Sequence, residues 1–408
     1  MATSDFKHAP AADEPTSLQQ KISLIAGRLA DARRLAEQAQ VREAVTRNSL
    51  TLALVEALSA RAEGEARLRR LAFDAYRQAA LRRESRPRRR SGLVDRLLGG
   101  LRAPGQALLI ARSGLWRPSG PGPARKLHDL RHMAAYARRG PNPAVAPSAL
   151  LDQAWYLSTL GEAPSRLSPL AHYLLSGWER GRAPHPLFDP AYYAARNAGA
   201  LAGWRASPLE HFVRLGAPRG FDPHPLFSLA WYVAQRPELA QSGANPLAHY
   251  LEEGWGQGLS PHPLFDPHWY LSQAPRSAAS GPPLVHYLAE GWRQGLSPHP
   301  LFDPAWYLTH YPDVARTGDE PLSHFAAAGG REGRDPGPWF DTAHYAAARG
   351  DALGADANPL VDYLLGGAWR VSEARPGFAT AAYLAARPEA AGSGLTPLDH
   401  WARLAGRG

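Results

Sequence analysis

The amino-acid sequence predicts an all-α fold: an N-terminal coiled coil or helical hairpin, followed by a tandem array of seven short-helix repeats. Two short elements recur along residues 148–408, one written F-D-x-x-x-Y and the other P-L-x-H, and both return every 37–39 residues. Because two independent anchors share one period, this segment is a stack of similar supersecondary units. The 38 prolines and 38 glycines of the 408-residue chain exclude long helices from most of it, and proline at this density argues against strands.

Charge and aromatic content divide the chain into two different parts. Residues 1–140 carry 27 basic and 13 acidic side chains, a net charge of +14, whereas the remainder has a net charge of −5. Of the 38 Phe, Tyr and Trp residues, 33 lie in 148–408. The front of the chain is therefore a basic helical region, and the back holds the aromatic core.

The first 16 residues lack an apolar stretch, so we expect a disordered N-terminus and no signal peptide. No run of about 18 uncharged apolar residues occurs, which excludes a transmembrane helix. A bacterial cytoplasmic protein is the expected class.

Residues 17–84 are expected to form a coiled coil or a helical hairpin. Apolar side chains from Leu18 to Ala39 alternate three and four positions apart, and a second periodic stretch begins at Leu54. This spacing is typical of a coiled-coil seam, which would make the chain a homo-oligomer through 17–84. A plain helical hairpin, broken near Asn48, accounts for the same pattern.

Residues 85–147 are expected to form a basic amphipathic linker. A polybasic run directly precedes a short apolar helix, a pattern typical of an anchor at an anionic membrane surface. A solvated charge run in a flexible linker is the alternative, and the lack of an accompanying aromatic or zinc element argues against nucleic acid as the partner. The candidate membrane-binding residues are Arg82, Arg83, Arg86, Arg88, Arg89, Arg90, Leu93, Leu97 and Leu98.

Each repeat contains signals for two or three short helices. An Asp-Pro or Asp-x start such as Asp303-Pro304 supplies a capping carboxylate, and a polar residue plus proline such as Asn245-Pro246 starts a second helix. A glycine five residues after the P-L-x-H position, for example Gly254, is expected to end that helix in the left-handed conformation. The segment P-H-P-L-F then forms an extended connector to the next unit.

No catalytic motif emerges from the sequence. Neither a Walker-type phosphate loop, nor G-x-S-x-G, nor H-E-x-x-H occurs. The absence of cysteine excludes disulfides, thiolate metal sites and cysteine nucleophiles. We therefore expect no catalytic residue, no metal and no cofactor.

Thirteen of the 16 histidines lie in the repeats. An element copied seven times usually serves the copied structure, and Asp362 replaces the P-L-x-H histidine in one copy, so we expect these histidines to pack and to hydrogen-bond to a neighbouring connector. The connector histidines are expected to be exposed. With three tryptophans they form the candidate ligand-facing surface: His185, His224, His262, His299, Trp178, Trp255 and Trp292.

Units such as FDPAWYLTHYPDVARTGDEPLSHFAAAGGREG, residues 302–333, resemble the repeats of about 38 residues found beside glycosyltransferase and rhamnan-synthesis-type domains in bacterial surface-polysaccharide proteins. The resemblance covers residues 148–408. It implies a non-catalytic scaffold or binding protein in cell-envelope polysaccharide biosynthesis, whose array contacts a glycosyltransferase or a glycan. The front of the chain would then hold the protein at the inner membrane. A glycan-modifying enzyme with an unrecognised site on the array is the alternative.

Overall fold

The computed structural model describes residues 53–71, 74, 103–116, 123–140, 146–161 and 167–405, together with the helical residues 34, 38 and 40. Across these ranges the chain is helical, and its β-structure consists of isolated bridges inside the connectors. The expected all-α repeat array is therefore confirmed. The expected disordered N-terminus, the apolar seam side chains between Leu18 and Ala39 and the candidate membrane residues from Arg82 to Leu98 lie outside the described residues.

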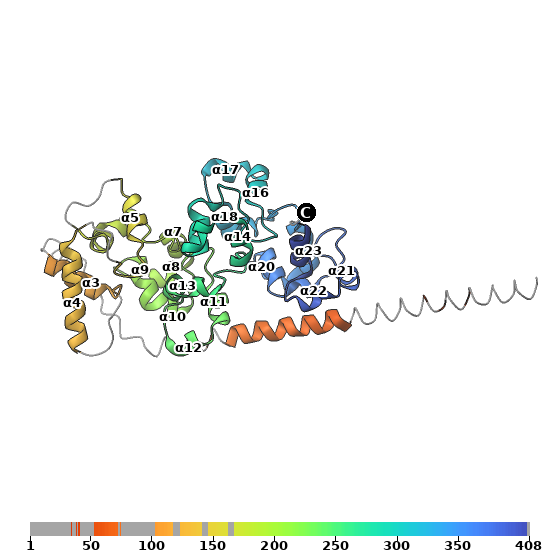
Figure 1. The fold of residues 1–408 in the computed structure, drawn as a ribbon, viewed down its shortest axis with the longest axis horizontal. Helices are drawn as coiled ribbons and strands as arrows, with labels where there is room; N and C mark the ends of the chain where they lie inside the picture. The colour runs from red at the N-terminus through yellow and green to blue at the C-terminus, as the bar shows by residue number, and fades with distance from the viewer. Residues whose placement is uncertain are drawn as a thin grey trace, which may run out of the picture.

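The array runs along the long axis of the molecule, from α5 at one end to α23 at the other (Figure 1). The first helices of its seven repeats are α5 (Gln153–Ser158), α7 (Pro190–Arg196), α11 (Leu229–Gln235), α14 (Pro267–Gln273), α16 (Pro304–His310), α19 (Thr342–Arg349) and α21 (Thr380–Ala386). The last helices are α6 (Pro169–His172), α9 (Pro208–His211), α13 (Pro246–Glu252), α15 (Pro283–His286), α18 (Pro321–His324), α20 (Pro359–Leu364) and α23 (Pro397–Ala405).

Repeats 2 to 7 have a short helix between these two. These middle helices are α8 (Ala198–Leu201), α12 (Glu238–Ser242), the 3-10 turn η5 (Arg276–Ser280), α17 (Pro312–Thr317), the 3-10 turn η8 (Gly350–Ala352) and α22 (Glu389–Gly392). In four repeats the last helix widens into a π-turn, at η1 (Tyr173–Gly177), η3 (Phe212–Gly216), η6 (Tyr287–Gly291) and η7 (Phe325–Gly329). In repeats 1, 2, 3 and 6 one further short helical turn follows: η2 (Trp178–Arg180), α10 (Ala217–Arg219), η4 (Gly254–Gln257) and η9 (Gly367–Arg370).

The helix starts are those that the sequence predicts. In six repeats the capping side chain accepts a hydrogen bond from a backbone N–H of the first turn; for example, Asp303 accepts from Trp306 at 2.9 Å. In five repeats the backbone N–H of the capping residue also donates to the first connector proline, as Asp189 does to Pro223 at 3.0 Å. Each of these five connectors is thereby held against the start of the repeat that it follows.

The two sequence anchors of each repeat meet in the core. The Tyr156 hydroxyl lies 2.8 Å from His172 Nδ1, and the same pair recurs in five other repeats at 2.5–3.0 Å. In repeat 6 the Tyr345 hydroxyl donates instead to Asp362 Oδ2 at 2.5 Å. The expected bond from the P-L-x-H histidine to a connector is therefore wrong, because the buried tyrosine of the same repeat occupies its Nδ1.

The glycine after the last helix has a different role from the one expected. Gly177 has φ −64° and Gly216 has φ −70°, so both are right-handed. A Cβ at Gly216 would overlap the Tyr193 hydroxyl and lie 3.0 Å from its Cζ. The glycine is required for space, because the core tyrosine lies directly against its Cα. The left-handed residue comes four positions later, at Gly220 with φ 82°.

Two helices within the expected linker belong to the core. α3 (Ala103–Ser113) and α4 (Pro123–Arg138) cover the open end of repeat 1, and Leu109 and Ile110 are fully buried there. The Tyr136 hydroxyl donates to Gln153 at 2.7 Å and accepts from the Leu170 N–H at 3.2 Å. The prediction of a linker throughout 85–147 is therefore wrong, since this helix pair supplies the cap that the first unit of a repeat array needs.

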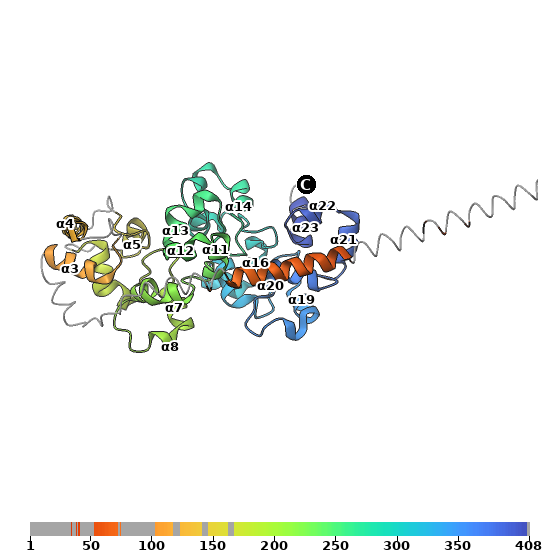
Figure 2. The same cartoon turned by 90° about the horizontal axis from the view of Figure 1, so that it is seen from below.

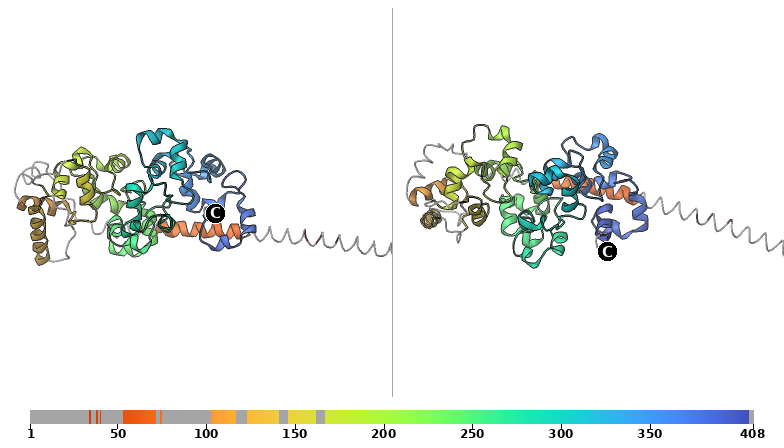
Figure 3. Two further views of the ribbon diagram at one scale, coloured as in Figure 1. Left: turned by 45° about the horizontal axis from the view of Figure 1, so that its top comes forward. Right: turned by 90° about the horizontal axis from the view of Figure 1, so that it is seen from above.

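The helix at 53–71 lies along the array rather than apart from it. Figures 1, 2 and 3 show it, in orange, beside the C-terminal repeats, with one end near α11. Arg69 Nη2 donates to the Leu365 carbonyl at 3.0 Å, and Glu63 pairs with Arg370 at 3.2 Å. The part of the predicted periodic stretch that is described thus packs on repeat 6, with Ala62 buried at the contact.

Candidate functional site

Three of the four connector histidines are buried and the fourth, His262, is partly buried, so their expected exposure is wrong. His185, His224 and His299 are 5%, 7% and 4% exposed. Each Nδ1 accepts the backbone N–H two residues later, as His185 does from Leu187 at 3.0 Å, and His262 makes the same bond. Burial lowers the pKa of His185 and of His224 to about 4, and that of His262 to about 3. These rings brace the connector turn through their Nδ1 atoms instead of standing out together as one exposed surface.

The three candidate tryptophans are half-buried against the core. The Nε1 groups of Trp178 and Trp292 each donate to a carbonyl one turn earlier, at 3.3 Å, and Trp255 packs on the same core. Arg293 lies 4.2 Å from the centre of the Trp292 ring. Part of each indole therefore stays accessible, but the histidines predicted to accompany them do not.

A second aromatic series lies beside the buried tyrosines of the core. Each fully buried anchor tyrosine of repeats 1 to 5 is preceded by an aromatic residue that is only half-buried. The residues of this series, the aromatic ladder, are Trp155, Tyr192, Trp231, Trp269 and Trp306. Consecutive helical residues point 100° apart, so one ring enters the core while its neighbour reaches the surface.

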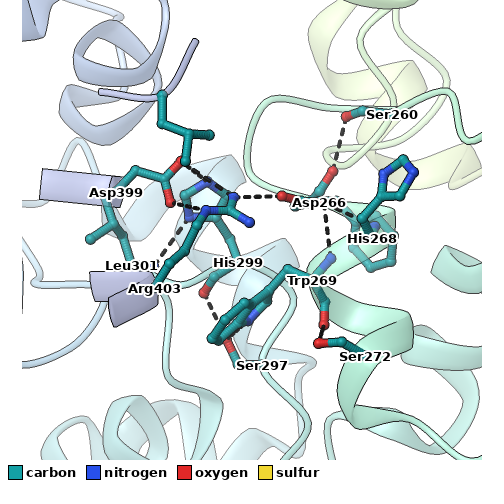
Figure 4. Close-up of polar contacts among 12 residues, drawn as sticks. Ser260, Asp266, His268, Trp269, Ser272, Ser297, His299, Leu301, Asp399 and Arg403 are labelled. Atoms are coloured by element: carbon teal, nitrogen blue, oxygen red, sulfur yellow. Dashed lines mark hydrogen bonds and ion pairs between the residues drawn. The ribbon is translucent and has the colours of Figure 1, made fainter. Parts of the chain in front are cut away.

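An ion-pair network joins repeat 4 to repeat 7 (Figure 4). Arg403 Nη2 lies 2.5 Å from Asp266, and its Nε lies 2.9 Å from Asp399. Burial opposes the charge of Asp266, but hydrogen bonds from the Trp269 N–H and from Arg403 outweigh it and lower the pKa of Asp266. His299 lies 3.9 Å from Asp399. Because one guanidinium bridges a carboxylate of repeat 4 and a carboxylate of repeat 7, the network is suited to locking these two repeats together.

A cavity lies between the helix at 53–71 and repeats 3 and 6. It has a volume of about 450 Å³. The charged and aromatic residues in its wall are Arg69, Arg70, Arg349, Arg370, Asp362 and Trp231. The predicted site residues contribute only His262 to this wall. The one sequence feature that distinguishes a residue of this wall is Asp362, which is the only departure from histidine in the P-L-x-H element.

The described ranges contain neither a cluster of metal-ligating side chains nor a membrane-spanning helix. Over those residues, no three His, Asp or Glu side chains come together as metal ligands would. No helix of the described segments combines the length and the apolar character needed to span a bilayer.

Comparison with known proteins adds no relative: no family model matches the chain, and neither the curated proteins nor the solved structures include a match to it.

Proposed function

We propose that this chain is a non-catalytic scaffold or binding protein in bacterial cell-envelope polysaccharide biosynthesis, with its repeat array in contact with a glycan or a glycosyltransferase. The observation that carries the proposal is the aromatic ladder, which places one partly exposed ring per repeat on five successive repeats. Flat aromatic faces with a polar edge are suited to extended ligands that offer apolar ring faces and hydroxyls. The resemblance of the repeats to those of surface-polysaccharide proteins supports the same ligand class.

The polar chemistry of the repeats favours binding over catalysis. The P-L-x-H histidines bond to tyrosine, the connector histidines bond to backbone amides, and the starting aspartates cap helices. A general base must reach the proton that it removes, and these groups are engaged inside the fold.

Calorimetric titration of the full chain with a rhamnan oligosaccharide tests the proposal. Trp155→Ala should weaken binding by about tenfold if the ring is an anchor of the contact. Trp204→Ala is the matched control, because Trp204 is a half-buried tryptophan outside the ladder. Equal loss in both variants, or no binding to glycan or to a co-purified glycosyltransferase, would refute the glycan-assembly role. Turnover of a nucleotide-sugar by the pure chain would favour the enzyme alternative.

The proposal includes a location at the inner face of the inner membrane. The polybasic run from Arg82 to Arg90 would attract anionic lipid, and Leu93, Leu97 and Leu98 would insert. Flotation of the full chain with anionic vesicles should weaken but persist as salt rises, because only the Coulomb part is screened. A variant with the arginines from Arg83 to Arg90 replaced by Gln should lose the salt-sensitive part. A full chain that stays with the pellet fraction at low salt would contradict the anchor.

Self-association through 17–84 is the remaining part of the proposal. A charge placed at Ile25, in the middle of the predicted seam, would be buried in an oligomer and should dissociate it. Sedimentation of the full chain and of Ile25→Glu distinguishes the cases. A wild-type chain that sediments as a monomer at all concentrations would leave the intramolecular arrangement.

A further inference from the structure

The residues of repeat 6 that contact the helix at 53–71 differ from their equivalents in other repeats. Gly366 has φ 125°, a conformation open to glycine, and a Cβ there would lie 2.8 Å from the Ala62 Cβ. The equivalent position is Glu253 in repeat 3 and Glu290 in repeat 4. Repeat 6 also has Asp362 in place of the anchor histidine. The departures of repeat 6 from the common pattern therefore face the docked helix and the cavity beside it.

The wall of this cavity has an excess of positive charge. Arg349 is neutralised by Asp362, with its Nε 2.8 Å from Oδ2, and Arg370 pairs with Glu63 across the contact. Arg70 donates from Nε to the Ala66 carbonyl of its own helix at 3.4 Å, which uses one of five guanidinium N–H groups. Arg70 thus presents charged donors at the cavity.

Arg69 lies deeper in the same wall. Its Nη2 donates to a backbone carbonyl, and its guanidinium carbon lies 5.8 Å from the centre of the Trp231 ring. Burial lowers the pKa of the Arg69 guanidinium, and nearby Glu65 only partly offsets this. An anion in the cavity would therefore stabilise a charge that the protein alone compensates poorly.

We propose that this cavity binds a small phosphorylated ligand, with its phosphate oxygens on Arg69 and Arg70 and a ring of the ligand on Trp231. Guanidinium groups match phosphate in geometry and keep their charge at all physiological pH values. Apolar side chains of Pro263, Val361 and Leu365 line the rest of the wall. The volume of about 450 Å³ lies within the range of small-molecule sites, about 300–1,000 Å³.

The inference does not rest on the proposed glycan contact, because phosphate recognition requires neither the aromatic ladder as a whole nor a partner. Failure of rhamnan binding and failure of phosphate binding are therefore separate results.

The test is calorimetric titration of the full chain with two probes, inorganic pyrophosphate and uridine diphosphate. Both should bind with one site per chain, and uridine diphosphate should bind more tightly because it adds a ring. Arg70→Gln should weaken both probes by about tenfold or more, since a charged hydrogen bond is lost. Trp231→Leu should weaken uridine diphosphate and leave pyrophosphate nearly unchanged.

Arg316→Gln is the matched control. Arg316 is exposed and donates from Nε to the Pro312 carbonyl at 3.4 Å, the same bond that Arg70 makes within its helix, but it lies outside the cavity wall. Its replacement should change neither affinity. As a second readout, pyrophosphate should raise the melting temperature of the wild type and of Arg316→Gln, but not that of Arg70→Gln.

Two results would overturn the proposal: no saturable binding of either probe at concentrations up to about 10 mM, or an equal loss in Arg316→Gln and Arg70→Gln, which would indicate non-specific charge attraction. Equal affinities for the two probes would overturn the ring contact with Trp231.

Discussion

The substitution Gly254→Ala tests the close approach of tyrosine and glycine on which six of the seven repeats are built. An added Cβ would overlap the Tyr232 hydroxyl, and it would lie 3.1 Å from Tyr232 Cζ and 3.4 Å from His249 Nδ1. Tyr232 is fully buried and its hydroxyl lies 2.7 Å from His249, so the ring cannot move without breaking this bond.

The expected cost follows from two terms. Overpacking a core costs about 1–3 kcal/mol, and leaving a buried polar group without its partner costs about 1–3 kcal/mol more. The lower backbone entropy of alanine in the unfolded state returns about 0.4–1 kcal/mol. We therefore expect the free energy of unfolding to fall by about 1–5.5 kcal/mol.

Gly256→Ala is the matched control. Gly256 lies two residues along the same turn, η4, and no atom lies within 4 Å of a Cβ added there. Urea unfolding of both variants, followed by circular dichroism, should show a loss for Gly254→Ala and a neutral or stabilising effect for Gly256→Ala. In the double variant Tyr232→Phe/Gly254→Ala the overlap with the hydroxyl is absent, so the two changes should couple favourably by about 0.5–3 kcal/mol. Equal stability of the two single variants would refute the close-approach argument.

Three further predictions concern charge and docking. Burial lowers the pKa of His185 to about 4 from 6.5. As pH falls from 6.5 towards 4, the unfolded state binds a proton that the folded state excludes, so unfolding free energies measured in urea should drop by about 1.4 kcal/mol per pH unit for each such histidine; a flat profile would contradict the burial. Arg403→Gln should cost about 1–3 kcal/mol, because Asp266 loses its partner, whereas the exposed Arg387→Gln should cost little in the same assay. Gly366→Ala should speed amide hydrogen exchange in 53–71 and leave the other repeats protected; unchanged exchange would contradict the docked helix.

The helix starts and the all-α character were predictable because they depend on contacts within a few residues, and the period was predictable because the anchors recur in the sequence itself. Asp303 caps the helix that Pro304 begins, and Asn245 caps the one that begins at Pro246, as the sequence indicates. The repeat can likewise be recognised from its two recurring anchors without knowing which residues those anchors contact. These features follow from the local geometry of the backbone.

The sequence by itself therefore determined how many repeats there are and where their helices begin. Only the tertiary structure decided what each conserved position of the repeat touches: that Tyr193 meets His211, that Gly216 is small to admit that tyrosine, and that His185 turns inward. It also decided that 53–71 docks on repeat 6, almost 300 residues further along the chain. The physical reason is that the path of the array accumulates from a small rotation at every repeat, and this rotation, set by packing between whole units, decides which distant side chains become neighbours.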